Sequence, residues 1–437
     1  MSHTRMSTYR LWRDQSFVLL WTGRTISLLG TAITTVALPI LVYRLTASAF
    51  LTALLATLEV LPYLIFGLFA GEMADRVDRR SLMVGCDLLN TLLLGSIPIA
   101  GWLHVLTVSH IFAVALLSAS AFVWFDAADF GILPILVGRE HLVGATSAIS
   151  SMSTLVSIIG PAIGGALVAI LSPVSAISFD AISYLLSAIS LLLIPRSLST
   201  IYQSETSQRS SWEQTFKGIR EGISFLWHQQ LLRALTFLGF GNSFTGGAIG
   251  GLLVVYAVQA LHLSSNDARI GFLFAAGALG SFVASILLPM LTKHFPVGWI
   301  TLTSMSLNFL FILGLTWTSS VSIALVLYTC WEFSYTLITM NGRILRQLVT
   351  PDHLQSRVNA YARMIAWGGT PFGAMIGGII AEGITIRLTY LFMAVGITLS
   401  LVVGWFSPLR RRTMAKELVD SHASTETASR TEDDPGY

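Results

Sequence analysis

The sequence predicts an all-α membrane protein of twelve transmembrane helices, arranged as two pseudo-symmetric six-helix bundles. Its 437 residues are 54% hydrophobic and only 11% charged, whereas soluble domains carry about 25% charged residues. Apolar stretches recur along the chain, and most of them reach the roughly 20 residues that a helix needs to cross a bilayer. These runs favour helices over the strands of a membrane β-barrel, which would be about 10 residues long and would alternate in polarity.

The expected spans divide into an N-terminal bundle over residues 17–195 and a C-terminal bundle over 233–408. A basic lead, 1–16, precedes them, and a polar, acidic tail, 409–437, has the composition of a disordered segment. The expected spans are 17–43, 49–71, 81–103, 109–130, 143–170, 174–195, 233–259, 268–291, 299–318, 321–342, 359–381 and 388–408.

A polar interior stretch, residues 196–232, separates the two sets of six spans. Its second part carries apolar side chains at helical spacing, which predicts an amphipathic helix on the inner membrane surface. These positions, between Trp212 and Trp227, are Phe216, Ile219, Ile223 and Leu226.

The distribution of basic residues predicts that both termini are cytoplasmic. Of the 26 Lys and Arg residues, Arg44, Arg269 and Arg387 would lie outside and Arg24 within the first span, leaving all others inside. This is the positive-inside bias of an even number of spans. The first apolar run is too long for a signal peptide and lacks a small-residue cleavage site, so we expect an uncleaved helix.

The two halves of the chain repeat. Residues 132–142 align with residues 344–354, and both segments read Ile-Leu-x-x-Leu-Val followed later by His-Leu. Farther along, Gly164-Gly165 matches Gly377-Gly378. Both copies precede the fifth helix of their half or lie in it, as expected for a transporter that arose by duplication of six spans.

A ten-residue stretch, 71–80, joins the second and third expected spans and carries six charges. A connection this short and charged cannot lie in hydrocarbon, and its arginines place it in the cytoplasm. Its pattern resembles the loop between helices 2 and 3 of major facilitator superfamily transporters, G-x-x-x-D-R-x-G-R-R. Asp78 replaces the usual glycine, as in the drug-efflux branch related to macrolide and enterobactin exporters. The matching residues are Gly71, Asp75, Arg76, Arg79 and Arg80.

This resemblance implies the major facilitator fold over about residues 10–410 and a gating role for the loop. In the family the aspartate is a latch that faces the start of helix 11, which here implies that Asp75 faces residues near Asn359. The free amides and partial positive charge of a helix start would favour that carboxylate. The alternative is a charge cluster that only sets the topology.

The fifth expected span contains Gly160, Pro161, Gly164 and Gly165, which resemble the antiporter signature ending in G-P-x-x-G-G. Proline bends a helix by removing a hydrogen bond, and the glycines permit close helix contact. A bent helix with a smooth surface suits a pivot between the inward-facing and outward-facing arrangements of a transporter. Ser147 and Val156 stand where the full signature has glycine, so ordinary tight helix packing remains the alternative.

Two carboxylates near the middle of spans, Glu59 and Glu332, are the candidates for proton coupling. A charged residue at this depth costs about 2.5–3.5 kcal/mol on insertion scales and needs a partner, water or a proton. Loss of water disfavours the charged form of a carboxyl group, so either side chain could exchange a proton against cargo. The alternative is a structural carboxyl group that stays protonated.

Other charged residues also fall within the expected spans. Family members often have an aspartate where Asp87 and Asp180 stand, which favours structural pairing for both. Relatives usually read Pro-Ala-Arg at the end of helix 4, whereas this sequence reads Ala127-Ala128-Asp129 at that place, directly after Asp126. Arg24 either neutralises one of the acids or snorkels to the inner surface.

An aromatic and polar set could line a cavity for amphipathic substrates, although placement against lipid is the commoner reason for any one ring. Within it we single out Asn242, Trp331 and Tyr335, and the other members are Trp124, Phe125, Phe240 and Phe244.

The sequence argues against an enzyme. It lacks G-x-x-x-x-G-K-[ST], H-E-x-x-H and G-x-S-x-G, and its two cysteines, Cys86 and Cys330, fall inside spans without metal-binding spacing. We expect no cofactor, no metal and no nucleic-acid partner. The partners would be a small-molecule substrate, protons and membrane lipid, with the protein a monomer.

The resemblance therefore implies a secondary transporter in the bacterial plasma (inner) membrane, which exports drug-, macrolide- or siderophore-like amphipathic molecules in exchange for protons. Its bundles would rock about a site near the midplane, as in alternating access. One alternative is a proton-coupled importer or facilitator of the same fold. Another is a membrane sensor or scaffold that does not transport.

Overall fold

The computed structural model describes residues 11–74, 77–195, 224–350 and 352–410. Within these ranges the regular structure is helical and no strand occurs, which confirms the predicted fold class. The first half of the chain forms α2 (Gln15–Thr46), α3 (Ala49–Ala74), α4 (Arg79–Trp102), α5 (Val108–Ile170) and α6 (Pro173–Leu192).

The second half of the chain forms shorter and more interrupted helices. They are α9 (Gln230–Gly251), α10 (Leu253–Gln259), α11 (Arg269–His294), α12 (Val297–Trp317), α13 (Val321–Val349), α14 (Asp352–Gly383), α15 (Ile386–Met393), α16 (Val395–Phe406) and the short 3-10 helix η1 (Pro408–Arg410).

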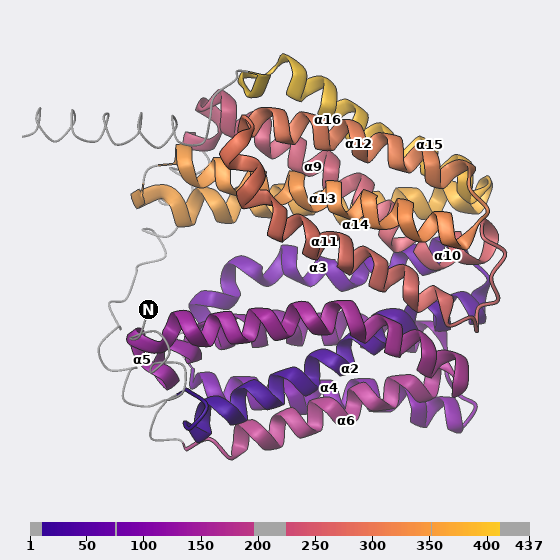
Figure 1. The fold of residues 1–437 in the computed structure, drawn as a ribbon. Coiled ribbons are helices and arrows are strands. Elements are labelled where there is room, and N and C mark those ends of the chain that lie inside the picture. Colours follow the sequence, from indigo (N-terminus) through magenta and orange to yellow (C-terminus); the bar gives the residue numbers. More distant parts are fainter. Residues whose placement is uncertain (1–10, 75–76, 196–223, 351, 411–437) are drawn as a thin grey trace, which may run out of the picture. The chain divides into compact units, whose positions relative to one another are not determined.

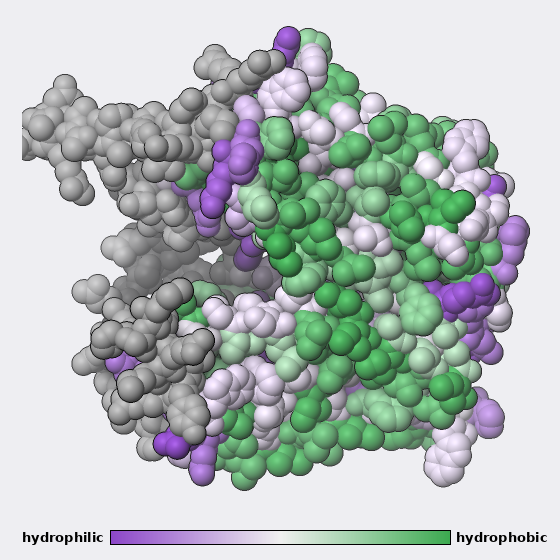
Figure 2. All heavy atoms as spheres, viewed as in Figure 1, coloured by the Kyte–Doolittle hydropathy of each residue, from purple (hydrophilic) through white to green (hydrophobic). Residues whose placement is uncertain are grey.

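Eleven helices in the described ranges are long and apolar enough to cross a membrane, or up to twelve if α9 and α10, bent by 49°, form one broken span. The ribbon of Figure 1 shows these long helices, coloured by their position in the sequence. Where large side chains are exposed they are often apolar, as for Phe130 at 87% and Trp102 at 83%. Hydrophobic residues cover the sides of the helices in view in Figure 2, as a lipid-facing surface requires.

Helix α5 contains two spans, Val108–Gly138 and Glu140–Ile170, which meet at a break. Gly138 has φ 72° and ψ 162°, a backbone conformation that essentially only glycine adopts. Its counterpart in the internal repeat is Thr350, which ends α13 in an extended conformation. Both copies of the repeat therefore mark the junction between two consecutive spans.

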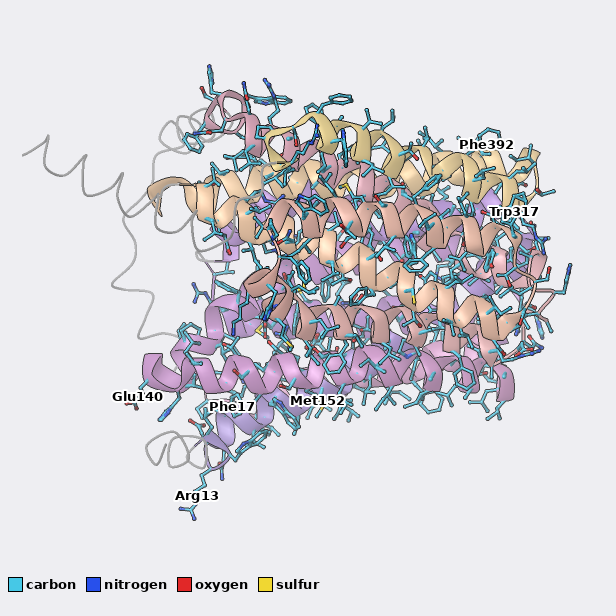
Figure 3. All side chains as sticks on the ribbon, turned by 45° about the horizontal axis from the view of Figure 1, so that its top comes forward. Arg13, Phe17, Glu140, Met152, Trp317 and Phe392 are labelled. Carbon is cyan, nitrogen blue, oxygen red and sulfur yellow. The ribbon has the colours of Figure 1, made fainter. Side chains whose placement is uncertain are left out.

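The chain forms two compact units, and unit 1 comprises Met1–Arg209, Gly251–Ala278 and Gly378–Ile386. Within it α6 packs against α2 and α4, and Figure 1 shows these three helices side by side. Arg13 and Glu140 lie at the same end of this unit in Figure 3, where α2 begins and α5 breaks. A core cluster that includes Phe17, Met83 and Ile132 joins α2, α4 and α5.

Unit 2 comprises Ser210–Gly250, Leu279–Gly377 and Arg387–Tyr437. In it α12 packs against α13 and α16. Trp317 and Phe392, labelled in Figure 3, are 73% and 58% exposed at the ends of α12 and α15.

Most of the expected amphipathic helix, including Phe216 and Ile219, lies outside the described residues. Leu226 is described, is 1% exposed and belongs to a small cluster with Leu232, Val358 and Ala362.

Candidate functional site

Glu332 lies half-buried on α13 and faces α11 inside unit 2. Its Oε2 accepts a hydrogen bond from Ser281 Oγ at 3.3 Å, and the Tyr328 hydroxyl, one turn away, also lies within hydrogen-bonding range. Ser281 Oγ in turn accepts from Thr336 Oγ1 at 2.8 Å. All of these neighbours are neutral hydroxyl groups, so the carboxyl group has polar partners but no ion pair among the described residues.

Three aromatic rings stack along the same helix. The centroid of Trp331 lies 5.5 Å from that of Tyr328 and 5.5 Å from that of Tyr335. Trp331 is 1% exposed, its Nε1 donates to Asn308 Oδ1 at 3.1 Å, and Asn308 Nδ2 donates back to the Trp331 carbonyl at 3.4 Å. Trp331 therefore anchors the other two rings in the core of the bundle instead of lining open space itself.

Asn242 of α9 is brought to the same stretch of α13. Its Nδ2 donates to the Tyr335 carbonyl at 3.4 Å and to Thr339 Oγ1 at 3.3 Å, whereas its buried Oδ1 has no partner among the described residues. Gly246, one turn farther along α9, leaves room for the Tyr335 ring, since a Cβ at this position would lie 2.5 Å from that ring. Thus unit 2 assembles Glu332, Trp331, Tyr335 and Asn242 within two facing helices.

Glu59 is placed differently. It lies on α3 in unit 1 with an exposed side chain, and no hydrogen bond or ion pair joins it to another of the described residues. Glu59 and Glu332 therefore belong to separate units.

Arg24 forms an ion pair with Asp129, and both side chains are mostly withdrawn from solvent, at 22% and 11% exposure. Asp126, on the same helix as Asp129, also lies within electrostatic range of Arg24. Of the two interpretations left open for Arg24, the structure shows neutralisation of an acid. Asp129 is the residue that departs from the family pattern, so here it supplies the counter-charge.

Asp180 and Asp87 lie in a polar layer between α2, α4 and α6. Asp180 is 1% exposed and its Oδ1 accepts from Ser183 Oγ at 3.2 Å, against Gly30, where a Cβ would meet that same oxygen at 2.5 Å. Asp87 is 0% exposed. The Ser187 hydroxyl lies near it, but neither carboxylate oxygen meets strict hydrogen-bond geometry.

The glycines of the expected pivot make close contacts inside unit 1. A Cβ on Gly160 would lie 2.5 Å from the Ala32 Cβ, and one on Gly164 would lie 3.0 Å from the Ile33 Cα, both on α2. A Cβ on Gly165 would lie 2.6 Å from the Cα of Gly271 at the start of α11. Pro161 is also part of this surface, since its carbonyl oxygen would lie 2.5 Å from a Cβ on Gly271.

Further contacts join the first half of the sequence to the same segments of the second half. Glu382 Oε2 accepts from Ser48 Oγ at 3.1 Å and from the Phe50 amide at 3.0 Å. Arg44 Nη2 donates to the Ser265 carbonyl at 3.1 Å. We call these contacts, together with that of Gly165 and Gly271, the seam of unit 1; sequence reasoning missed Ser48 and Glu382 because they lie 334 residues apart.

Just beyond Ser265, Asp267 lies before the start of α11. A hydrogen bond from the Arg269 side chain, 2.6 Å from Asp267 Oδ2, holds the pKa of this carboxyl below its ordinary value.

The charged loop is described only in part. Asp75 and Arg76 lie outside the described residues, and so does the side chain of Asn359, so the predicted latch stays a prediction. Gly71 lies in the last turns of α3. The other two matching residues bind backbone oxygens: Arg79 Nη1 donates to Gly131 O, and Arg80 Nε donates to Leu191 O at 2.9 Å.

The structure also shows a pocket in unit 2 that sequence reasoning did not identify. It is lined in part by Arg343, Arg346 and Arg363, which the sequence analysis had counted only as cytoplasmic charge. Among the residues that the structure describes, no group of three or more His, Cys, Asp or Glu side chains could hold a metal ion.

Apolar spans in sequence-related halves, with polar groups buried between helices, define a multi-pass membrane transporter. The profile of a family described as transmembrane secretion effector matches residues 6–434. The chain belongs to this family of the major facilitator superfamily, whose members are transporters and not enzymes.

Two named relatives are efflux proteins. The multidrug efflux pump Tap of Mycolicibacterium fortuitum is 24% identical over 389 residues, which cover 87% of this chain and 93% of that protein. Macrolide efflux protein A of Streptococcus pyogenes is 22% identical over 289 residues, covering 66% of this chain and 69% of that protein.

Solved structures share the fold. A bacterial homologue of the lysosomal transporter Spinster, inward-facing and unoccupied, matches with a TM-score of 0.72 at 13% identity, over 94% of this chain and 98% of that chain. The nucleoside transporter NupG matches with a TM-score of 0.72 at 12% identity, over 89% and 97%.

Proposed function

We propose that this transporter exports amphipathic small molecules in exchange for protons, by alternating access. The efflux relatives support the direction of transport and the substrate class. The observation that carries the coupling is Glu332: an acid inside a membrane-spanning bundle whose contacts are neutral hydroxyl groups. Such a group changes the charge of the bundle when it binds or releases a proton, and an intramembrane ionisable residue is by default a functional candidate.

In this proposal, Asn242 and Tyr335 contribute polar and aromatic contacts to cargo beside Glu332, with Trp331 holding the Tyr335 ring. The Oδ1 of Asn242 has no hydrogen-bond partner among the described residues, and in this proposal it accepts a hydrogen bond from the ligand. Glu59 would face an aqueous route, because an exposed carboxylate in hydrocarbon is costly. Arg24 and Asp180 would support the helices of unit 1, the first by its ion pair and the second by its hydroxyl partners.

The proposal also covers the moving parts and the setting. Gly160, Pro161, Gly164 and Gly165 would form the pivot, and Gly71, Asp75, Arg76, Arg79 and Arg80 the gating loop. The two six-helix bundles would rock about their common site. The protein would act as a monomer in the bacterial inner membrane with both termini in the cytoplasm.

Transport in everted membrane vesicles with an imposed pH gradient tests this proposal. We expect drug accumulation in vesicles that are acidic inside, and drug-induced proton release from them. Glu332→Gln should abolish both the proton flux and gradient-driven accumulation, because the amide cannot exchange a proton. Glu140→Gln is the matched control, since Glu140 has a side-chain exposure of 79% and lies far from α13 in sequence.

The double variant Glu332→Gln, Glu59→Gln decides the coupling assignment. Persistent proton-coupled drug flux in this variant would exclude both carboxyl groups as carriers of the coupling proton. Accumulation in the opposite gradient would indicate an importer, and absence of flux for a broad drug and siderophore panel would favour a sensor or scaffold.

A further inference from the structure

The pocket of unit 2 is strongly basic. It lies among α9, α12, α13 and α14, and the space between its lining atoms amounts to about 480 Å³ when the part open to solvent is included. Among the described residues, its lining includes three arginines, Arg343, Arg346 and Arg363, and no aspartate or glutamate. A site whose described lining carries three positive charges and no negative charge favours an anion.

Arg346 is the critical group. The residue is only 7% exposed, and its Nε is buried without a hydrogen-bond partner in the described structure. Among the described residues, the charged group in electrostatic range of Arg346 is Arg343, which has the same sign. An uncompensated buried charge is strongly destabilising, so this guanidinium lacks the partner that its position calls for.

Another buried arginine of this protein, Arg80, has hydrogen-bond partners within the protein itself. Arg80 is 5% exposed, and it donates to two backbone oxygens at the end of α6: Nε to Leu191 O at 2.9 Å and Nη2 to Leu192 O at 2.5 Å. Arg346 also lies in the last turn of a helix, α13, where a cation complements the helix dipole. Among the described residues, no side-chain hydrogen bond from Arg346 to a backbone carbonyl is found there. The helix dipole alone does not compensate the buried charge of Arg346.

The rest of the lining fits a ligand with an anionic head and a less polar body. Arg343 and Arg346 are three residues apart on α13, which places them on one face. Arg363 lies over the Trp367 ring at 5.8 Å. Away from the arginines, the lining supplies the hydroxyl groups of Ser243, Thr301 and Thr339 and the apolar side chains of Leu235, Leu238 and Ile338.

We propose that this pocket binds a phosphate group, with Arg346 and Arg343 as its principal ligands. Guanidinium forks match phosphate oxygens in a bidentate geometry, and more than one arginine suits an anion that carries more than one charge. The phosphate could belong to an anionic lipid headgroup or to a phosphorylated solute. Both sources share the chemistry, and the site is independent of the proposed transport direction.

Binding to the purified full-length protein in detergent tests the site without any transport assay. The probes are inorganic phosphate and short-chain phosphatidylglycerol, with phosphatidylcholine and chloride at equal ionic strength as controls. We expect phosphate or phosphatidylglycerol to raise the melting temperature. The apparent affinity should fall about tenfold or more in Arg346→Gln, because hydrogen bonds to charged groups are the strong ones.

Arg343→Gln should weaken binding as well, and it carries the test if Arg346→Gln fails to fold, since Arg343 is exposed. Lys293→Gln is the matched control: it removes an exposed positive charge in unit 2 that does not line the pocket, and it should bind as the unaltered protein does. A response to phosphatidylglycerol alone identifies a lipid site, and a response to inorganic phosphate identifies a site open to solutes.

Two results would overturn the proposal. One is a melting temperature that responds to neither phosphate probe beyond the chloride control. The other is equal binding by the Arg343→Gln, Arg346→Gln and Lys293→Gln variants, which would show that any binding is non-specific.

Discussion

At the scale of single residues, the most consequential contact is the ion pair of Arg24 and Asp129. Hydropathy could show that Arg24 lies within a span, and comparison with the family pattern could show that Asp129 is unusual. Neither observation identifies them as partners, because the pairing depends on how α2 packs against α5. The same limit applies to Glu332, whose depth was readable from the sequence but whose contact with Ser281 was not.

This pair gives a stability prediction. Arg24→Leu alone should destabilise the protein by about 3–5 kcal/mol, because it leaves the Asp129 charge buried without a partner. The double variant Arg24→Leu, Asp129→Leu should recover most of that loss, since two apolar residues replace two charges. Thermal unfolding in detergent measures both. A single variant as stable as the unaltered protein would show that Asp129 does not need Arg24.

At the scale of helices, the existence of the spans was predictable and their ends were less so. A long apolar stretch predicts a segment that is buried in lipid, and each predicted span overlaps a helix in the described ranges. The same window is blind to backbone geometry. It predicted an interruption over 131–142, whereas α5 continues to Gly138 and resumes at Glu140, and it gave no sign of the bend between α9 and α10.

The break in α5 gives a second prediction. Gly138→Ala should destabilise the protein by about 1–3 kcal/mol, because a residue with a Cβ is strained at φ 72° and ψ 162°. A steric clash would not contribute to this loss, since no atom lies within 4 Å of the position of that Cβ.

Gly85→Ala is the control for Gly138→Ala. Gly85 is another glycine with open space around its Cβ, but it has no positive φ. Melting temperatures of the two variants give the comparison, and equal values would argue against backbone strain at Gly138.

At the scale of the whole molecule, the seam of unit 1 joins segments from the two halves of the sequence. The proposed alternating access would require these segments to separate at some point in the transport cycle. Sequence reasoning identified one side of this contact, Gly165, from its resemblance to a family signature. It could not identify Glu382, whose partners Ser48 and Phe50 become neighbours only in the folded chain.

Cross-linking across the seam tests this requirement. In a background with Cys86 and Cys330 replaced by alanine, Ser48→Cys and Glu382→Cys joined by a short, reducible bifunctional thiol reagent should stop drug transport. Reduction should restore it. The single-cysteine variants, treated with the same reagent, control for local modification. Full transport by a completely cross-linked protein would show that the seam stays closed throughout the cycle.

The meeting of Gly165 with Gly271 has an energetic consequence. Two bare backbones can touch and part without freezing rotamers and with little apolar area gained or lost, so neither arrangement is strongly favoured by this contact. A balanced equilibrium is easily biased: about 5.5 kcal/mol carries a population from 1:99 to 99:1, and one charge crossing 100 mV supplies about 2.3 kcal/mol. In the proposed antiport, this smooth contact would keep the free energy needed for each turnover within the range that the proton electrochemical gradient supplies.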